Sequence, residues 1–328
     1  IQWCSSEFEV LQTKIVVSGS IGVAQAPYDG VKFKQLCRKA DIAMYEAKRN
    51  GRNCFEFYDV RFDEESDEKF SLIQRLRPAV QANALAVYYQ PLIDLKTGNI
   101  CALEALLRWP QEDGSMIFPD RFIPLAESSG LIDTLGAWVL NQACMFCAKQ
   151  QQNGNSELSI AVNLSFAQFK DGNLPQIVKG ALEISQLAPE HLELELTESI
   201  LADDNGNVIQ QLEQIKSLGV TFAIDDFGTG YSNLNYLRTF SAQKLKIDRI
   251  FINTLGFDEK DVPLVTAIIS IAESLGMATV AEGIENEAAL KKITEMGCDM
   301  GQGYYWSKPV PAEQIERLIE AQSPTNQR

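Results

Sequence analysis

The sequence predicts a parallel α/β fold, and two observations support that prediction. From residue 84 onward one unit recurs, in which an apolar helix leads through a glycine into a short hydrophobic strand and then into polar residues. Three examples are Ser217–Asp225, Ser274–Glu282 and Glu295–Gln302. The alternation of helix and strand extends over about 240 residues, which is the length of a (β/α)8 barrel.

A doubly wound open sheet is the other arrangement that alternates helices and strands. Open sheets of this kind often carry a GxGxxG or a P-loop motif after the first strand, and this chain has neither there. We therefore expect a TIM-like barrel rather than an open sheet.

A smaller α+β part and a connecting helix precede the repeats. We expect a helix over Phe33–Asn50 and a strand over Asn53–Tyr58, which together bury too little surface to fold alone. The segment from Asp63 to Asn83 is charged and then amphipathic, which indicates a linker helix. The predicted parts are an incomplete N-terminal domain (1–62), the linker helix (63–83), the barrel (84–322) and a tail (323–328).

Composition excludes several classes of function. Lysine and arginine total 29 against 44 acidic residues, so the net charge of −15 argues against binding a nucleic-acid polymer. An anionic ligand would therefore need local cations. His191 is the only histidine, which excludes sites built from several histidines. The abundant oxygen ligands favour Mg²⁺ or Mn²⁺ over Zn²⁺.

The cysteines and the apolar runs indicate a cytoplasmic protein. The seven cysteines are scattered along the chain and resemble reduced thiols. Cys144 and Cys147 form a lone CxxC in a predicted helix, Ala137–Gln152, and we interpret them as packing residues rather than zinc ligands. No apolar run is long enough to span a membrane. Because the chain begins at Ile1, we expect it to be the cytosolic fragment of a longer protein.

Two adjacent acids end one of the predicted strands. A helix ends at Gly219, a buried strand follows over Val220–Ile224, and Asp225 and Asp226 come next. Neighbouring side chains in a strand face opposite sides, so both acids can serve one site only where the backbone turns. Gly228 and Gly230 permit such a turn. The pair is either a turn or helix cap, as Asp often is, or a site for a divalent cation that offsets the repulsion.

Polar residues also close or interrupt the other strands. Each has an ordinary explanation as a surface charge, a cap or a loop residue, but those explanations do not predict that they recur in successive repeats. The carboxyl ends of barrel strands meet at one mouth, where active sites form. The candidates are Glu104, Arg108, Asn163, Glu195, Lys246, Glu282 and Gln302.

In combination these motifs resemble the EAL-domain cyclic-di-GMP phosphodiesterases, over about residues 84–320. The matching segments are Glu104–Arg108, Asn163–Ser165, Glu195–Glu198, Asp225–Ser232, Lys246–Asp248, Ala281–Gly283 and Gln302–Tyr304. The resemblance implies a (β/α)8 barrel with one antiparallel strand. It also implies hydrolysis of cyclic di-GMP to the linear dinucleotide pGpG.

The resemblance further implies a site with two Mg²⁺ or Mn²⁺ ions that activate a water. Glu104, Asn163, Glu195 and Asp225 would hold one ion, and Asp225, Asp226 and Glu282 the second. The implied catalytic residues are Glu104, Lys246, Glu282, Asp226 and Gln302, with Lys246 or Glu282 as the base. Ca²⁺ would inhibit, because it binds with looser geometry.

Substrate contacts and a loop anchor also follow from the resemblance. The implied substrate-binding residues are Gln90, Leu106, Arg108, Asn163, Asp226, Glu285 and Tyr304. Arg108 would bind a phosphate oxygen, and Glu198 would anchor the loop from Phe227 to Leu234. The same loop region would form a homodimer contact. Asn233 and Asn235 replace serines that are common there, and Ser241–Gln243 lacks the usual proline, which weakens the dimer expectation.

Residues 1–62 resemble the C-terminal end of a GGDEF (diguanylate cyclase) domain. The segments Ser18–Val23, Ala40–Lys48 and Gly51–Asn53 carry this resemblance. The Gly-Gly-acid-acid-Phe loop is absent from the chain, so we expect no cyclase activity. Two alternatives to a phosphodiesterase stay open: a non-catalytic cyclic-di-GMP receptor on the same fold, and a protein–protein module that uses the barrel as a scaffold.

Overall fold

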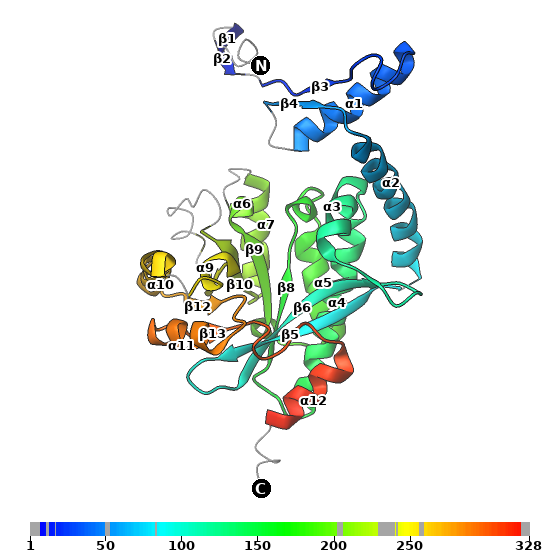
Figure 1. Ribbon diagram of the computed structural model, residues 1–328. Helices are drawn as coiled ribbons and strands as arrows, with labels where there is room; N and C mark the ends of the chain where they lie inside the picture. The colour runs from blue at the N-terminus through cyan, green and yellow to red at the C-terminus, as the bar shows by residue number, and fades with distance from the viewer. Residues whose placement is uncertain are drawn as a thin grey trace. The chain divides into compact units, whose positions relative to one another are not determined.

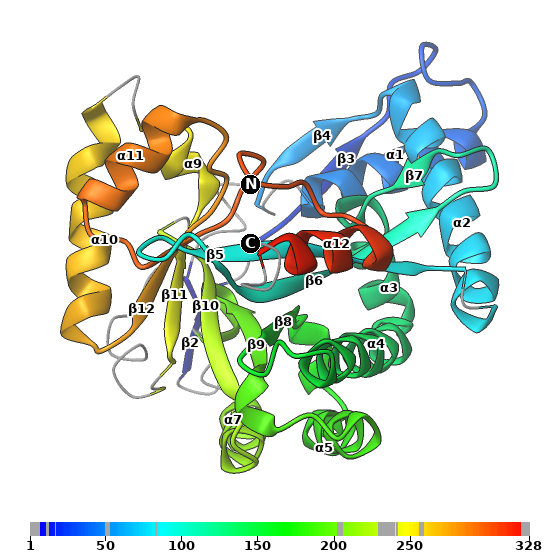
Figure 2. The same ribbon diagram turned by 90° about the horizontal axis from the view of Figure 1, so that it is seen from below.

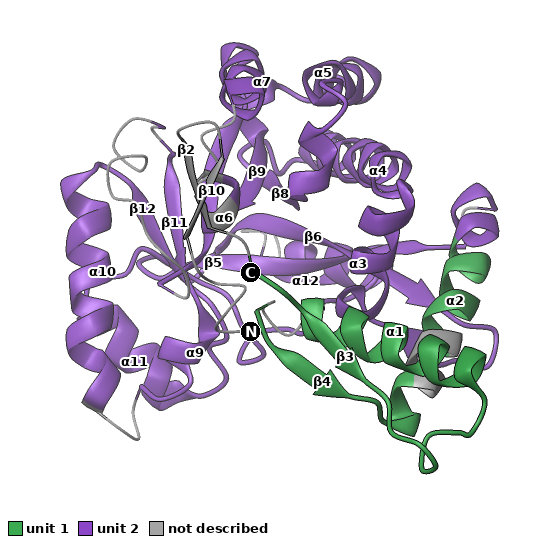
Figure 3. Cartoon of the chain, turned by 90° about the horizontal axis from the view of Figure 1, so that it is seen from above, with its two compact units in different colours: residues 1–76 green, residues 77–328 purple. Residues whose placement is uncertain are grey.

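The computed structural model describes residues 7–10, 13–16, 18–49, 53–82, 84–201, 206–228, 240, 242–255 and 259–322. The chain divides into two compact units, residues 1–76 and 77–328, which Figure 3 colours separately. The division falls inside α2 (Val60–Gln81), the helix that forms where the sequence predicted a linker helix over residues 63–83. The domain boundaries inferred from the sequence stay a prediction.

Unit 1 contains two pairs of strands and a long helix. β1 (Glu7–Val10) pairs with β2 (Thr13–Val16) antiparallel, and β3 (Ile21–Val23) pairs with β4 (Phe55–Phe57) parallel. The predicted helix forms as α1 (Phe33–Arg49). It packs on β3 so closely that a Cβ at Gly22 would collide with the α1 backbone at Ala40 and Met44. Glycine at this position permits the contact.

The described residues of unit 2 form a closed barrel of eight strands, as the repeats predicted. β5 pairs with both β6 and β13, which closes the sheet, and it runs antiparallel to both. The remaining neighbours in the barrel pair in parallel. The barrel strands are β5 (Ala86–Asp94), β6 (Ile100–Pro110), β8 (Ser159–Asn163), β9 (Leu192–Thr197), β10 (Thr221–Phe227), β11 (Lys244–Ile247), β12 (Ala278–Ala281) and β13 (Met300–Gly301).

Helices lie outside these strands (Figures 1 and 2). One further short strand, β7 (Met116–Ile117), pairs antiparallel with the end of β6. The main helices of unit 2 are α3 (Pro119–Ser129), α4 (Ile132–Gln152), α5 (Leu174–Ser185), α7 (Gly206–Ser217), α10 (Val262–Ser274), α11 (Glu287–Glu295) and α12 (Ala312–Gln322). Shorter helical turns are Phe166–Phe169, Pro189–His191, α6 (Glu198–Leu201), α9 (Arg249–Ile252) and Glu259–Asp261.

The helix–glycine–strand pattern forms as the sequence predicted. Gly219 follows α7 with φ 96°, a left-handed conformation that favours glycine, and β10 begins two residues later. Cys144 and Cys147 of the CxxC are both fully buried on α4, and burial raises the pKa of each thiol to about 12. Among the described helices, none combines the length and the apolarity that crossing a bilayer requires.

Candidate active site

Charged side chains gather at the carboxyl ends of the barrel strands. Asp225 lies near the end of β10, Lys246 lies near the end of β11, and Glu282 directly follows β12. Glu195 of β9 pairs in register with Ala223 of β10. The ends of parallel strands lie at the same rim, so these residues from separate repeats meet.

The paired acids reach one site through a break in the strand geometry. Asp226 has φ 55°, and the register of β10 against β11 shifts between Ile224 and Phe227. The Asp226 N–H donates to Asp225 Oδ1 at 3.0 Å. The turn expected at Gly228 and Gly230 therefore begins earlier, at Asp226 itself. Gly228 also has a positive φ, 97°, whereas Gly230 lies outside the described residues.

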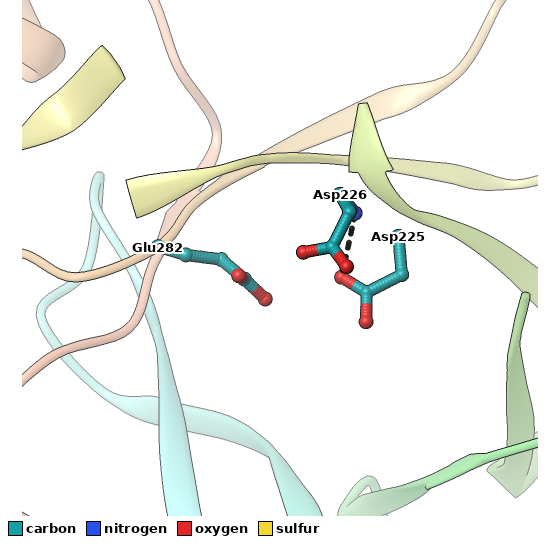
Figure 4. Close-up of side chains that lie close together, drawn as sticks. All are labelled: Asp225, Asp226 and Glu282. Atoms are coloured by element: carbon teal, nitrogen blue, oxygen red, sulfur yellow. Dashed lines mark hydrogen bonds between the residues drawn. The ribbon is translucent and has the colours of Figure 1, made fainter. Parts of the chain in front are cut away.

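Asp225, Asp226 and Glu282 form a cluster that can hold a cation. One carboxylate oxygen from each lies within 4.8 Å of the other two. Figure 4 shows Glu282 approaching the two aspartates from the opposite side of a shared space. Three carboxylates at this spacing supply the hard oxygen ligands that Mg²⁺ and Mn²⁺ prefer.

Lys246 lies between four carboxylates. Its side chain is 1 % exposed, and Nζ lies 2.7 Å from Glu282 Oε1 and 2.8 Å from Glu195 Oε2. Nζ is also 3.2 Å from Asp225 Oδ1 and 3.9 Å from Glu104 Oε2. Burial alone would lower the pKa of Lys246, but the surrounding carboxylates outweigh burial and raise the pKa well above its ordinary value. The ammonium is therefore the central cation of the site.

Glu104 of β6 is held by two amides. Asn163 Nδ2 donates to Glu104 Oε1 at 2.7 Å, and Gln302 Nε2 donates to Glu104 Oε2 at 2.6 Å. Gln302 also donates to Gln90 Oε1 at 3.0 Å. Glu104, Gln302 and Gln90 are all buried. The structure thus brings together Glu104, Asn163, Glu195, Asp225, Asp226, Lys246, Glu282 and Gln302.

This group carries more negative charge than one ammonium can neutralise. Burial and the neighbouring Glu104 carboxylate raise the pKa of Glu195 well above its ordinary value. Burial raises the pKa of Glu282 to about 8 although Lys246 opposes the shift, and burial with the Asp225 charge raises the pKa of Asp226 to about 6. The site therefore favours bound protons or added cations.

Comparison with known proteins identifies the fold family. Residues 73–309 match the EAL domain, and residues 1–54 match the diguanylate cyclase, or GGDEF, domain. The chain belongs to the EAL family. It carries an EAL domain with a short GGDEF segment before it.

Relatives of this EAL chain are longer proteins. The bifunctional diguanylate cyclase/cyclic di-GMP phosphodiesterase MucR of Pseudomonas aeruginosa is 40% identical over 311 residues, 95% of this chain and 45% of that protein. The cyclic di-GMP phosphodiesterase NbdA of the same organism is 37% identical over 307 residues, 94% of this chain and 39% of that protein. The chain therefore spans less than half the length of either relative.

Solved structures show the same barrel. A structure titled as the MucR phosphodiesterase in complex with c-di-GMP has a TM-score of 0.72 and 42% identity, covering 75% of this chain and 99% of that one. The EAL enzyme Bd1971, with cAMP and cyclic-di-GMP bound, has a TM-score of 0.75 and 29% identity, covering 89% of this chain and 77% of that one.

The residues of this EAL domain fit a divalent metal centre on structural grounds. Beside the cluster of Asp225, Asp226 and Glu282, Glu195 Oε1 is buried and has no hydrogen-bond partner among the described residues. A buried carboxylate oxygen without a donor is costly unless a cation or a proton occupies it. A bound metal ion would offset the charge of the three clustered carboxylates and give the Glu195 oxygen a partner.

Arg108, for which the family resemblance implied a phosphate contact, lies near two aromatic rings. It is 9% exposed, and its Nη1 donates to the carbonyl oxygen of Leu107 at 2.8 Å. Its guanidinium carbon lies 5.9 Å from the ring centroid of Tyr88 and 5.8 Å from that of Phe118. Burial lowers the pKa of Arg108 from its ordinary value. The sequence did not predict that these two rings lie beside Arg108, because neither residue belongs to a motif or closes a predicted strand.

The other predicted substrate-binding residues lie in more open settings. Leu106 and Asn163 line a cavity of about 380 Å³ beside β6 and β8, together with residues of α3 and α4. Tyr304 is 55% exposed, and Lys308 Nζ lies 5.2 Å from its ring centroid. Glu285 is exposed. Their roles in substrate binding stay predictions.

The predicted loop anchor, Glu198, contacts the start of its loop, and its anchoring role stays a prediction. Glu198 Oε1 accepts a hydrogen bond from the Gly228 N–H at 2.8 Å. Residues 229–239 lie outside the described part of the chain, so the expected dimer contact over Phe227–Leu234 is described only at its first two residues. The homodimer and the cytoplasmic location stay predictions.

Proposed function

We propose that this EAL domain hydrolyses cyclic di-GMP to linear pGpG with two bound Mg²⁺ or Mn²⁺ ions. The observation that supports the proposal most is the convergence of five carboxylates on Lys246 and on one another. The names of MucR and NbdA as cyclic di-GMP phosphodiesterases add independent support.

The proposed metal ligands follow the contacts within the site. Asp225, Asp226 and Glu282 would hold one ion, because their carboxylates already share one space. Glu104, Asn163 and Glu195, with Asp225 between the two positions, would hold the other. Two such ions lower the pKa of a bound water and stabilise the attacking and leaving oxygens of the phosphodiester.

Lys246 and Glu282 would manage the proton of the attacking water. They lie 2.7 Å apart, and because Lys246 is already an ammonium, the Glu282 carboxylate would accept the proton while Lys246 donates a hydrogen bond to it. Gln302, which donates to Glu104 at 2.6 Å, would keep that carboxylate turned toward its metal. Substrate would bind from the side of Arg108 and Tyr304, where Arg108 supplies local positive charge to an acidic protein.

A metal-supplemented hydrolysis assay tests the proposal. Purified chain is incubated with cyclic di-GMP and Mg²⁺ or Mn²⁺, and the products are identified by chromatography and mass spectrometry. We expect pGpG, little turnover with Ca²⁺, and a loss of activity in Glu104→Ala. Glu157→Ala, which removes an exposed acid outside the site, is the matched control and should retain full activity.

A cyclic-di-GMP receptor on the same fold is the rival function. It would bind the dinucleotide and leave it intact in the presence of metal. Saturable binding of cyclic di-GMP by metal-loaded protein, with no pGpG after prolonged incubation, would replace the proposed hydrolase with this receptor.

A further inference from the structure

Gln90 and Gln302 form a chain of side-chain amides that ends on Glu104. Gln90 Nε2 donates to the carbonyl oxygen of Ser307 at 3.1 Å, and Gln90 Oε1 accepts from Gln302 Nε2 at 3.0 Å. Gln302 Nε2 then donates to Glu104 Oε2 at 2.6 Å. Gln302 therefore donates to both of its neighbours, Gln90 and Glu104, and Gln90 donates in turn to Ser307.

The main-chain carbonyl of Ser307 fixes the orientation of the two amide side chains, Gln90 and Gln302. A carbonyl oxygen can only accept, so the amino end of Gln90 faces Ser307 and its oxygen faces Gln302. An amide nitrogen carries two protons, and Gln302 directs one to Gln90 and one to Glu104. A reversed Gln302 would place its oxygen against the Glu104 carboxylate, where two acceptors repel.

The barrel closure places Gln90 where it can act on Glu104. Gln90 on β5 lies directly opposite Glu104 on β6, and β5 also pairs with β13, which leads into Gln302. Gln90 is 8% exposed and Gln302 is 4% exposed. The antiparallel strand thus links the first and last parallel strands through a buried polar contact.

We propose that Gln90 is a positioning residue: it orients Gln302, and through Gln302 it holds the Glu104 carboxylate for metal binding. This role differs from the direct substrate contact that the sequence resemblance implied for Gln90. The inference rests on the proposed metal role of Glu104. Partners behind a metal ligand typically change metal affinity or activity by about 10–100-fold when they are removed.

The test compares Gln90→Leu, Gln302→Leu and the double variant by Mn²⁺ affinity, measured calorimetrically without substrate. We expect Gln90→Leu to weaken Mn²⁺ binding by about tenfold. The double variant should bind Mn²⁺ no more weakly than Gln302→Leu alone, because Gln90 acts through Gln302. Additive losses in the double variant would overturn the proposal.

Gln150→Leu is the matched control. Gln150 is also a buried glutamine, 3% exposed, but it donates to Glu316 on α12 rather than to the site, so its variant should bind Mn²⁺ like the wild type. Circular dichroism confirms folding of each protein.

Kinetics separate this role from substrate binding. With Mg²⁺ at saturation, a positioning role predicts that Gln90→Leu lowers kcat for cyclic di-GMP with little change in KM. A raised KM with unchanged kcat and unchanged Mn²⁺ affinity would restore the direct substrate contact. If the wild type shows no hydrolysis, the proposed function fails, whereas the Mn²⁺ measurements still test the positioning role.

Discussion

Asp226 adopts a backbone conformation that L-amino acids rarely occupy, with φ 55°. This conformation brings its carboxylate to the same side of β10 as that of Asp225. The left-handed region costs most side chains about 1–2 kcal/mol, and Asp and Asn tolerate it best. An aspartate at this position therefore both tolerates the left-handed backbone and supplies a carboxylate to the proposed metal site.

Two substitutions at Asp226 separate these roles. Both Asp226→Asn and Asp226→Ala remove the charge that repels Asp225, but only Asn keeps the local hydrogen bonding that suits positive φ. We expect Asp226→Asn to exceed Asp226→Ala in unfolding free energy by about 1 kcal/mol in the metal-free protein. Urea unfolding monitored by circular dichroism measures the difference. Equal stability would show that the backbone at this residue is not strained.

Lys246 should support the metal-free fold more than an ordinary lysine does. Lys246→Met leaves Glu195, Asp225 and Glu282 without their shared ammonium, and removing one partner of a buried ion pair costs about 3–5 kcal/mol. We expect Mg²⁺ to recover part of this loss in thermal unfolding, because a cation again offsets the carboxylates.

Lys244→Met is the matched control for this prediction. Lys244 is a partly buried lysine of the same strand, and its Nζ lies 3.0 Å from Glu193, outside the proposed metal ligands. Its loss should also destabilise the fold, but without recovery by Mg²⁺. Equal recovery of both variants would mean that Mg²⁺ acts elsewhere.

Individual site residues could be predicted from the sequence where they close or interrupt a hydrophobic strand. Glu195 and Lys246 are examples, since each is a charged residue among the hydrophobic residues of its strand. The burial of Lys246 between four carboxylates could not be predicted, because it depends on the distance between strands that are far apart in the chain. Tyr88 and Phe118 beside Arg108 carried no sequence signal, because neither residue belongs to a motif.

At the scale of elements, the turn after β13 depends on close backbone packing. A Cβ at Gly303 would collide with the backbone of Ile284, whose N–H donates to the carbonyl oxygen of Gln302 at 3.0 Å. This contact joins the segment after β12 to the segment after β13. It therefore fixes where Gln302 enters the site.

Matched glycine substitutions test this packing. Gly303→Ala should lower the unfolding free energy by about 1–3 kcal/mol, because the obstructing atoms are main chain and cannot rotate away. Gly180→Ala, inside α5 with no atom near the new Cβ, should raise it by about 0.4–1 kcal/mol. Denaturant unfolding measures both. A neutral Gly303→Ala would show that the turn adjusts.

Elements were predictable where a local signal marks their ends. The glycine after α7 and the hydrophobic run of β10 are such signals, and both were confirmed. The break in β10 was assigned to Gly228 and Gly230, since glycine is the usual residue with positive φ. The structure places it first at Asp226, which adopts that conformation inside the strand pairing.

At the scale of the molecule, the barrel was predictable from the length over which helix and strand alternate. The antiparallel direction of β5 came only from the family resemblance, because a strand pattern does not reveal strand direction. The net charge of −15 is also a whole-chain property, and the candidate active site gathers five of the carboxylates around one lysine. Binding of protons and of metal ions should therefore be coupled there.

The pKa shifts give this coupling a sign. In the folded metal-free protein, burial raises the pKa of Glu282 from its ordinary 4.5 to about 8. Burial also raises the pKa of Asp226 from its ordinary 3.8 to about 6. Between the ordinary and the raised values, the folded state binds more protons than the unfolded state, so stability falls as pH rises. The contribution of Glu282 is fully present below about pH 4.5 and is lost as pH rises through about 8.

We therefore expect the midpoint of thermal unfolding of the metal-free protein to fall between about pH 5 and pH 8.5. Saturating Mg²⁺ should raise the midpoint more at the higher pH, because the ion then replaces protons that have already left. Scanning calorimetry with and without Mg²⁺ at both pH values measures the effect. Glu282→Gln should flatten the pH dependence and reduce the Mg²⁺ response together. An equal Mg²⁺ shift at both pH values would show that protons and metal do not compete for these carboxylates.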